Sequence, residues 1–571
     1  MTKKIKNINK NQKGFYFEDY EIKNYNTKSK NLNFSIKRVS LVFFIFLFFG
    51  TIYSFKIVYL SLIKEENYFL NKYSGKKIVK RQDILDRNNI ILAKNTKVYN
   101  AAIRPNLVKD KKKLLINLMI NFPELNIVEI KENLEKGKFF YLKKKINPLE
   151  REKFWNLGEK SIDLSEVYET RIYPQKSLFS HVLGQTNDKG KGISGLEKSF
   201  NQILKDSNSS LILSLDSNLQ FLIREELIEA SKIFKTIGSA ALLMDIHNGE
   251  ILSLVSLPDS DLNKRINLDD PKYLNKITMG VYELGSVFKT FTLAAGLESK
   301  AIEYDTKFRN LKSQIRCGKH TIREHDQLPK DLTSEEILIV SSNIGAIRIA
   351  QKVGLEGYKN FLHSIELFNK IDFELDEVGT PLKFNWGKCK LATSSYGHGI
   401  TTTLLQLAKA YAIIGNGGFK INPTIIKDKN TLNEKNEKII SSETSNIMNQ
   451  VLRKVVSEDA GTANFANISG YDVGGKTGSA YKSINGVYDP NKKRNTFVSL
   501  FPMHKPKYLL LVMLDEPKPA PNYIYSNPNG TKHTGEWRNT SGWNTVEIAG
   551  KIIRKIGPIL AINNLQVASN F

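Results

Sequence analysis

Gly285-Ser-Val-Phe-Lys-Thr290 is the stretch on which the interpretation of this chain depends. It begins a segment with the apolar spacing of a helix, which places Ser286 in the first helical turn. Lys289 follows three positions later on the same helix face, so its amine should lie beside the Ser286 hydroxyl. An uncharged amine can take the proton of a serine nucleophile, and burial beside Phe288 and Phe291 would favour that uncharged form.

Two more motifs follow in chain order. Ser341-Ser-Asn343, two hydroxyls and an amide, comes after an apolar run and precedes another helix-like stretch. Lys476-Thr-Gly-Ser479 comes after Gly474-Gly475, and these glycines would thin a strand so that a ligand backbone could lie beside it. The lysine of this motif supplies a positive charge, and its two hydroxyls can bind a carboxylate.

Each motif is a weak signal by itself. Ser61-Leu-Ile-Lys64 has the serine–lysine spacing, and both Ser29-Lys-Asn31 and Ser483-Ile-Asn485 have the serine–asparagine spacing. Serine and asparagine are also common helix caps, and Lys-Thr-Gly could be an edge strand with a glycine bulge. In order, and each in a suitable predicted element, the three motifs predict one site for acyl transfer through a serine ester without a histidine.

Length and composition restrict the other functions. A chain of 571 residues is too long for one compact domain, so we expect two or more folded units. The net charge of +26 could indicate nucleic-acid binding, but lysine is dispersed along the whole chain and we expect no nucleic-acid partner. No histidine or cysteine cluster has metal-ligand spacing, so we expect neither a metal nor a cofactor. Export would permit a disulfide between Cys317 and Cys389, but the sequence leaves their pairing open.

The N-terminus predicts a membrane protein. Residues 1–38 form a basic tail, and the apolar run at 39–63 is long enough to span a bilayer if Lys56 extends toward the interface. The basic flank places the tail in the cytoplasm and the chain after Lys64 outside. A cleaved signal peptide is the alternative, but the long polar lead and the absence of a small-residue cleavage site favour an uncleaved, single-pass anchor.

The rest of the chain divides by pattern. Residues 64–215 alternate short strand-like runs with charged helical stretches, and residues 216–571 form a more regular domain. Apolar runs on both sides of Asn248-Gly249 predict a hairpin. Strands at both ends of this domain with helices between them predict an α+β fold, one antiparallel sheet flanked by helices. We expect helices at 219–234, 286–297, 402–414 and 544–556, and further strands at 474–481, 496–501 and 508–514.

With these motifs the chain resembles the class B penicillin-binding proteins, specifically peptidoglycan D,D-transpeptidases of the FtsI (division) type. The resemblance implies a penicillin-binding transpeptidase fold over residues 216–571 on an elongated mixed α/β pedestal, a dimerisation-like domain over residues 64–215. Ser479 stands where relatives more usually carry threonine, which keeps a hydroxyl. The matching landmarks are Arg81–Ala93, Arg171–Pro174, His181–Gly184, Gly192–Glu197, Met244–Leu252, Tyr396–Gly399, Leu405–Ala408, Gly461–Ala463 and Ser541–Asn544.

The resemblance also implies a role for each motif residue. Ser286 would attack the carbonyl between the two terminal D-alanines of a stem peptide, and Lys289 would take its proton. Ser341 would relay a proton to the leaving amine, and Asn343 would orient Lys289 and the donor peptide. The backbone N–H groups of the nucleophile and of the last hydroxyl residue in the Lys-Thr-Gly-Ser motif would form the oxyanion hole. The terminal carboxylate would be bound by Lys476, Thr477, Gly478 and Ser479. Lys476 would also be a catalytic residue.

The implied biological role is the cross-linking of cell-wall strands at the division septum, with penicillins acylating the same serine. The implied partners are peptidoglycan stem peptides, β-lactams, the membrane and divisome proteins, including a glycosyltransferase of the division or shape type. The implied location is the bacterial inner membrane, with the catalytic domain in the periplasm.

Three other functions share parts of this pattern. An elongation-type transpeptidase would use the same chemistry with other partners, but the Gly-Trp-Asn ending and the modest pedestal favour division. A β-lactamase or carboxypeptidase would need neither an anchor nor a pedestal. A catalytically inactive sensor would not need an intact nucleophile, amine and strand lysine.

Overall fold

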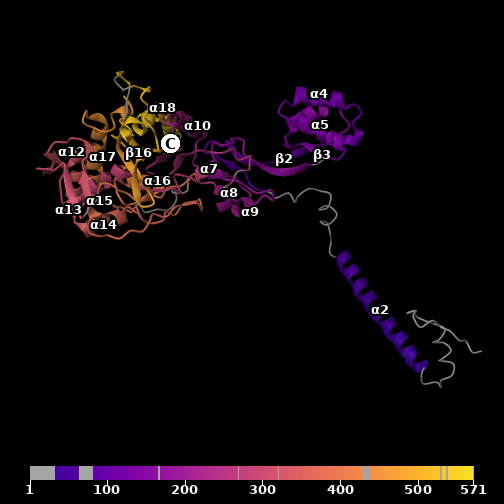
Figure 1. The fold of residues 1–571 in the computed structure, drawn as a ribbon. Coiled ribbons are helices and arrows are strands. Elements are labelled where there is room, and N and C mark those ends of the chain that lie inside the picture. Colours follow the sequence, from indigo (N-terminus) through magenta and orange to yellow (C-terminus); the bar gives the residue numbers. More distant parts are fainter. Residues whose placement is uncertain are drawn as a thin grey trace, which may run out of the picture. The chain divides into compact units, whose positions relative to one another are not determined.

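The computed structural model describes residues 32–62, 81–164, 167–265, 267, 269–318, 320–428, 437–526, 530–534 and 538–569 (Figure 1). The chain forms two compact units, Met1–Lys77 and Ile78–Phe571, which are treated separately below. Most of the predicted basic tail (1–31), the last residue of the predicted anchor and the first part of the predicted pedestal (64–80) lie outside the described residues.

The first unit holds the described helix α2 (Leu32–Leu62). Its segment Arg38–Val58 has a mean hydropathy of 2.2, and none of it is buried against other parts of the chain. The predicted apolar helix is therefore confirmed, and it is long enough to cross a membrane. The helix begins before the predicted start at Val39 because neither proline nor glycine interrupts Leu32–Arg38.

The second unit begins with a six-stranded mixed sheet organised around β2 (Ile91–Ile103). This long strand pairs antiparallel with β1, β3, β4 and β5, and β1 pairs in parallel with β6. Leu114, Leu118 and Phe154 from the neighbouring helices belong to a separate small core on this sheet. The other elements of this part are β1 (Ile84–Leu85), η1 (Pro105–Leu107), α4 (Lys111–Asn121), α5 (Ile127–Lys136), β3 (Phe140–Ile146), α6 (Pro148–Asn156), β4 (Ile162–Asp163), β5 (Val167–Ile172), α7 (Ser180–Leu183), α8 (Gly195–Ser199), α9 (Ile203–Asp206) and β6 (Leu211–Ile212).

A buried ionic cluster joins three of the sequence landmarks. The Glu197 carboxylate accepts hydrogen bonds from Arg81 Nε at 2.5 Å and from Arg171 Nε at 2.6 Å. All three side chains are almost completely excluded from solvent. Removing one partner of such a cluster would leave an unpaired buried charge, so the three landmarks act as one structural unit.

The main sheet has five strands in the order β15-β16-β17-β7-β8, each antiparallel to its neighbour. β7 (Gly238–Asp245), β8 (Ile251–Leu257) and β17 (Tyr508–Asp515) are buried along nearly their whole length, so both faces of the sheet are covered. β15 (Gly474–Ile484) lies at one edge and pairs with β16 (Val487–Phe501). This confirms the predicted antiparallel sheet flanked by helices.

Two groups of helices cover this sheet (Figure 1). α10 (Ser217–Ile233) and α18 (Thr545–Ser569) pack on each other and on the strands, and α11 (Lys289–Glu298), α16 (Leu404–Gly415) and α17 (Ser442–Ser457) form the second group. Every residue of α16 is buried, and so is every residue of α11 except the last. A helix buried all round is a core helix, so α11 holds its side chains in fixed positions.

The helix predicted from residue 402 starts at residue 404. Thr402 and Thr403 form the short strand β14 with β9, and the Thr403 hydroxyl then caps α16. The remaining elements are η2 (Pro271–Tyr273), β9 (Val281–Tyr282), η3 (Gly285–Phe288), β10 (Lys307–Phe308), β11 (Gln314–Cys317), β12 (His320–Arg323), β13 (Leu332–Thr333), α12 (Ser334–Ile339), α13 (Asn343–Val353), α14 (Leu355–Ser364), α15 (Lys390–Ser394), β14 (Thr402–Thr403), η5 (Asn464–Ala466), β18 (Ile524–Ser526), β19 (Lys532–Thr534) and η6 (Ser541–Trp543).

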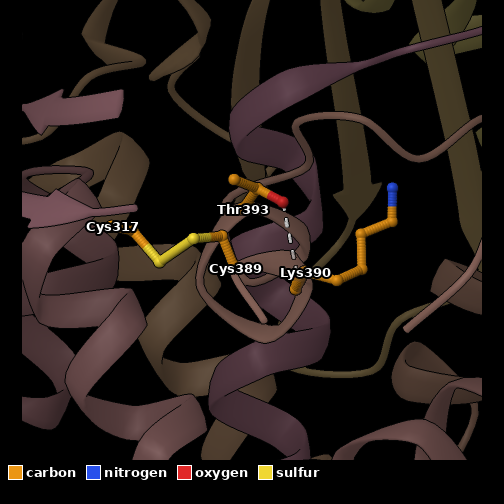
Figure 2. The surroundings of a disulfide bond; sticks show 4 residues. All are labelled: Cys317, Cys389, Lys390 and Thr393. Carbon is orange, nitrogen blue, oxygen red and sulfur yellow. Dashed lines mark hydrogen bonds between the residues drawn. A yellow bond between two sulfur atoms is a disulfide. The ribbon is translucent and has the colours of Figure 1, made fainter. Parts of the chain in front are cut away.

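Cys317 and Cys389, whose pairing the sequence left open, form a disulfide with a Cα–Cα distance of 5.8 Å (Figure 2). Cys317 ends β11 at the turn of the β11–β12 hairpin, and Cys389 directly precedes α15. The Thr393 hydroxyl donates to the Lys390 carbonyl in the first turn of that helix. The disulfide links the two-stranded β11–β12 hairpin, which would be only marginally stable by itself, to α15.

Removal of this disulfide should destabilise the second unit. The disulfide closes a loop with a sequence separation of 72 and so lowers the entropy of the unfolded chain. This effect adds about 4 kcal/mol to the free energy of unfolding. We expect Cys317→Ser combined with Cys389→Ser, or a reducing agent, to lower the melting temperature of the purified protein. The double variant is the control, because a reductant should not change its melting temperature further. A native protein that has two free thiols before any reduction would contradict the pairing.

Candidate active site

Ser286 lies in the 3₁₀ turn η3, which leads directly into α11, and its side chain lines a cleft of about 880 Å³. The Lys289 N–H donates to the Ser286 carbonyl, so the serine sits one turn before the start of the core helix. Ser286 therefore lies in a helical turn as predicted, but this turn is the 3₁₀ turn before α11 and not the first turn of the α-helix. Because α11 is buried, the position of this hydroxyl is fixed by the protein core.

Lys289, the first residue of α11, is only 1% exposed. Its Nζ donates to the Ser341 carbonyl at 2.5 Å and lies 3.2 Å from Ser341 Oγ. Burial lowers the pKa of Lys289 to about 7, and the Glu324 carboxylate opposes part of that shift. A substantial fraction of this amine is therefore uncharged near neutral pH, as a proton acceptor requires.

Ser341 lies in the turn between α12 and α13 and adopts a φ of +61°. A left-handed backbone is uncommon outside glycine, and such strain persists only where surrounding contacts hold it. The Ser341 Oγ lies within hydrogen-bond distance of two amines, Lys289 Nζ at 3.2 Å and Lys476 Nζ at 2.9 Å. A hydroxyl oxygen can accept two hydrogen bonds, so this atom joins the first and third motifs.

Lys476 lies on β15 and is completely buried. Its Nζ also lies 3.2 Å from both the carbonyl and the hydroxyl oxygen of Thr477. Burial first, and repulsion from Lys289 second, lower the pKa of Lys476 well below its usual range. Thr477 and Ser479 both line the cleft. The Thr477 hydroxyl contacts Thr462 at 2.9 Å, and Ser479 Oγ accepts from the Ser541 N–H at 3.0 Å.

Two glycines allow β15 to approach the Ser286 turn. A Cβ atom on Gly478 would lie 2.4 Å from the Leu284 carbonyl oxygen and 3.2 Å from the Val287 nitrogen. A Cβ atom on Gly285, where φ is +62°, would lie 2.6 Å from the Ser479 carbonyl oxygen. A side chain does not fit at these distances. Gly478 of the third motif is therefore required because β15 packs directly against the turn that carries Ser286.

Asn343 starts α13 and is buried beside the same turn. Its Nδ2 donates to the Arg323 carbonyl at 2.9 Å. Its Oδ1 is a buried oxygen with no hydrogen-bond partner among the described residues. The contact that the resemblance implied, from this amide to Lys289, is not among its hydrogen bonds in the described part of the chain.

The sequence analysis missed several cleft residues, and Glu324 and His325 are the two that lie near the buried lysines. Glu324 and His325 follow β12 and line the cleft with Ser286 and Ser341. No short-range pattern marks them, because they reach the site only through the fold of the β11–β12 hairpin. Within the described segments no group of three or more His, Cys, Asp or Glu residues could hold a metal ion. Other lining residues are Phe465, Tyr481, Lys493, His533, Arg538 and Trp543.

Comparison with known families assigns both parts of the second unit. Residues 239–533 match the penicillin binding protein transpeptidase domain, and residues 76–231 match the penicillin-binding protein dimerisation domain. The chain is 31% identical to the peptidoglycan D,D-transpeptidase FtsI of Buchnera aphidicola subsp. Baizongia pistaciae, over 77% of this chain and 82% of that protein. It is 29% identical to the probable peptidoglycan D,D-transpeptidase FtsI of Caulobacter vibrioides, over 84% of this chain and 82% of that protein.

Solved structures agree on the fold. The crystal structure of penicillin binding protein 3 from Mycobacterium tuberculosis, complexed with aztreonam, superposes with a TM-score of 0.63 at 22% identity, covering 84% of this chain and 97% of that chain. The predicted fold is thus confirmed by the solved structure, and the predicted family is confirmed by both matched domains and by the relatives. The chain belongs to the class B penicillin-binding proteins and is a serine-type peptidoglycan D,D-transpeptidase, an acyltransferase.

Proposed function

We propose that Ser286 is the nucleophile of this transpeptidase and that Lys289 is its general base. The observation that carries this proposal is that Ser286 and Ser341 line one cleft, and that the Ser341 hydroxyl lies within hydrogen-bond distance of both buried lysines. The Ser286 oxygen forms a bond to the penultimate D-alanine carbonyl carbon while its proton passes to neutral Lys289. The C–N bond to the terminal D-alanine then breaks.

Ser341 relays a proton to the leaving amine. Its Oγ accepts from both lysines, so its own O–H remains available to donate into the cleft. An amine of a neighbouring strand then attacks the ester carbonyl, passes its proton back through the same groups, and regenerates the serine. Both half-reactions therefore use the same proton-transfer groups in opposite directions.

The third motif holds the terminal carboxylate of the donor peptide. Thr477 and Ser479 present hydroxyls to the cleft, and Gly478 keeps β15 close to the nucleophile. A bound carboxylate favours the charged form of Lys476, and that charge in turn disfavours protonation of the adjacent Lys289. Substrate binding thus promotes the form of the base that the reaction needs.

Asn343 and the backbone complete the site. Asn343 Oδ1 is a buried acceptor with no hydrogen-bond partner among the described residues, and a peptide N–H of the donor strand would satisfy it. The backbone N–H groups of Ser286 and Ser479 form the oxyanion hole, where each donor is worth about 3 kcal/mol. Penicillins acylate the same serine because the β-lactam carbonyl occupies the position of the scissile amide.

We also propose the division role, with cross-linking of stem peptides at the septum. The support is the resemblance to relatives named FtsI and the Gly542-Trp543-Asn544 segment, of which Gly542 and Trp543 line the cleft. On this proposal α2 is the single-pass anchor in the inner membrane and the catalytic domain is periplasmic, consistent with the basic tail. Divisome proteins, including a glycosyltransferase, would contact α2 and the pedestal.

Exposure to a penicillin should leave one covalent adduct on the protein. We expect mass spectrometry to place it on Ser286, to find none in Ser286→Ala, and to find acylation slowed by roughly 10²–10⁴-fold in Lys289→Ala, because a general base contributes this much. Ser483→Ala, outside the cleft lining, is the matched control and should be labelled at the native rate. An adduct on another serine would refute the assignment.

The acylation rate should rise with pH. Neutral Lys289 is the base, and its pKa is about 7, so the rate should increase about tenfold per pH unit below that value and level off above it. The measurement is the second-order rate of labelling by a fluorescent penicillin between pH 5 and 9, with circular dichroism as the control for folding. A rate that stays constant or falls over this range would exclude Lys289 as the base.

The division role predicts a location in the cell. A fluorescent protein fused to the N-terminus should concentrate at the septum of dividing cells. The chain is also 28% identical, over 77% of its length, to a protein of Bacillus subtilis named Stage V sporulation protein D. Relatives therefore differ in the process they are named for, and the cellular location tests the division role directly. Uniform lateral fluorescence would favour the elongation-type alternative and would leave the transpeptidase chemistry unaffected.

A further inference from the structure

Glu324, the residue directly after β12, binds the turn that carries Ser341 and the start of α13. Its Oε1 accepts from the Ser342 hydroxyl at 2.6 Å and from the Ile344 N–H at 2.8 Å, and its Oε2 accepts from the Asn343 N–H at 2.7 Å. One carboxylate thus accepts three hydrogen bonds from three consecutive residues. Charge-assisted hydrogen bonds of this kind are about twice as strong as neutral ones.

These contacts satisfy the beginning of α13. The first N–H groups of a helix have no partner inside the helix and carry a partial positive charge. Glu324 accepts from the first two, and the Ser342 hydroxyl accepts from the third, that of Gly345, at 2.9 Å. Glu324 also fixes Ser342 itself, so the whole cap depends on one side chain that comes from another part of the chain.

The capped turn holds Ser341 in its unusual conformation. Ser341 has a φ of +61° and directly precedes the residues that Glu324 binds. Its Oγ and carbonyl oxygen receive the hydrogen bonds from Lys289. Without the carboxylate the turn could relax toward an ordinary backbone conformation, and the hydroxyl would leave the position between the two lysines.

The hairpin that carries Glu324 is itself anchored. Its Ile322 is buried in a small cluster with Ile344 and Ile347 of α13. The Cys317–Cys389 disulfide ties its turn to the start of α15 (Figure 2). Glu324 is therefore presented to the turn by a covalently and sterically fixed element rather than by a free loop.

We propose that Glu324 is a positioning residue for acyl transfer, which holds the Ser341 hydroxyl between Lys289 and Lys476 by capping α13. This inference rests on the proposed roles of Ser286 and Lys289. Glu324 also carries a negative charge that raises the pKa of Lys289 against the effect of burial. Lys289 in turn acts on two neighbouring titratable groups, because the pKa of Lys476 and the pKa of His325 are each lowered first by burial and then by repulsion from Lys289.

Glu324→Gln tests both effects. The nitrogen of a glutamine amide cannot accept a hydrogen bond, so Glu324→Gln removes part of the hydrogen bonds that cap α13. We expect the turn that carries Ser341 to move as a result. We expect the plateau rate of labelling by a fluorescent penicillin to fall roughly 10²-fold, the scale for a misplaced catalytic group. Loss of the negative charge lowers the pKa of Lys289, so the midpoint of the pH–rate profile should move to lower pH.

Glu298→Gln is the matched control. Glu298 accepts from the Ser441 N–H at 3.0 and 3.1 Å and from the Ser441 hydroxyl at 2.8 Å, at the start of α17. It has the same chemistry at another helix start, and it does not line the cleft. We expect Glu298→Gln to lower the melting temperature in a similar way, while the plateau rate of labelling and the midpoint of the pH–rate profile stay at native values.

Glu324→Asp keeps the charge but shortens the side chain. It should lower the plateau rate while the midpoint of the pH profile stays in place, and it decides the question if the glutamine variant does not fold. A native plateau in the aspartate variant would overturn the proposal. A native plateau rate together with a native midpoint of the pH profile in Glu324→Gln would also overturn the proposal. The same holds if Glu324→Gln lowers the melting temperature and the plateau rate but leaves the midpoint unchanged, because that pattern describes a structural role only. Absence of any adduct on the native protein would instead refute the proposed function on which this role rests.

Discussion

Two lysine amines buried side by side are the constraint on which this site depends. Like charges in a poorly solvated pocket repel strongly, and burial alone already disfavours each ammonium. The protein places one hydroxyl oxygen, Ser341 Oγ, between Lys289 and Lys476 and lowers the pKa of both. The consequence is an amine that can accept a proton near neutral pH without a histidine.

The fold is arranged to keep this pair out of water. Lys289 starts a helix whose residues are buried all round, and Lys476 lies on β15, the edge strand of the main sheet. An edge strand has unpaired backbone groups along its outer side, so a peptide can add to it as another strand. Gly285 and Gly478 let this edge approach the Ser286 turn, so on the proposed mechanism a peptide added to β15 would lie against Ser286.

The sequence predicted the parts of this arrangement that are local. Apolar periodicity located the core helix after Ser286, the Asn248-Gly249 turn located the β7–β8 hairpin, and three motifs in order located the cleft. The closeness of Gly478 to the Ser286 turn could not be predicted, because the two positions meet only after the sheet forms. The disulfide could not be predicted either, since Cys317 and Cys389 are separated by 72 positions and only the fold brings them together. Glu324 carries no motif, and its role is visible only from the hydrogen bonds it accepts.

On the proposed mechanism, the position of Glu324 also explains how a carboxylate can lie near the Lys289 amine without inactivating it as a base. A direct ion pair would stabilise the ammonium form of Lys289, and the base would be protonated at neutral pH. In the structure the Glu324 oxygens instead accept hydrogen bonds from the first N–H groups of α13 and from Ser342. The positive end of the helix competes for the carboxylate, so the charge acts on Lys289 from a distance and opposes only part of the shift caused by burial. One acidic side chain can therefore fix the geometry of the turn and still leave the amine free to accept a proton.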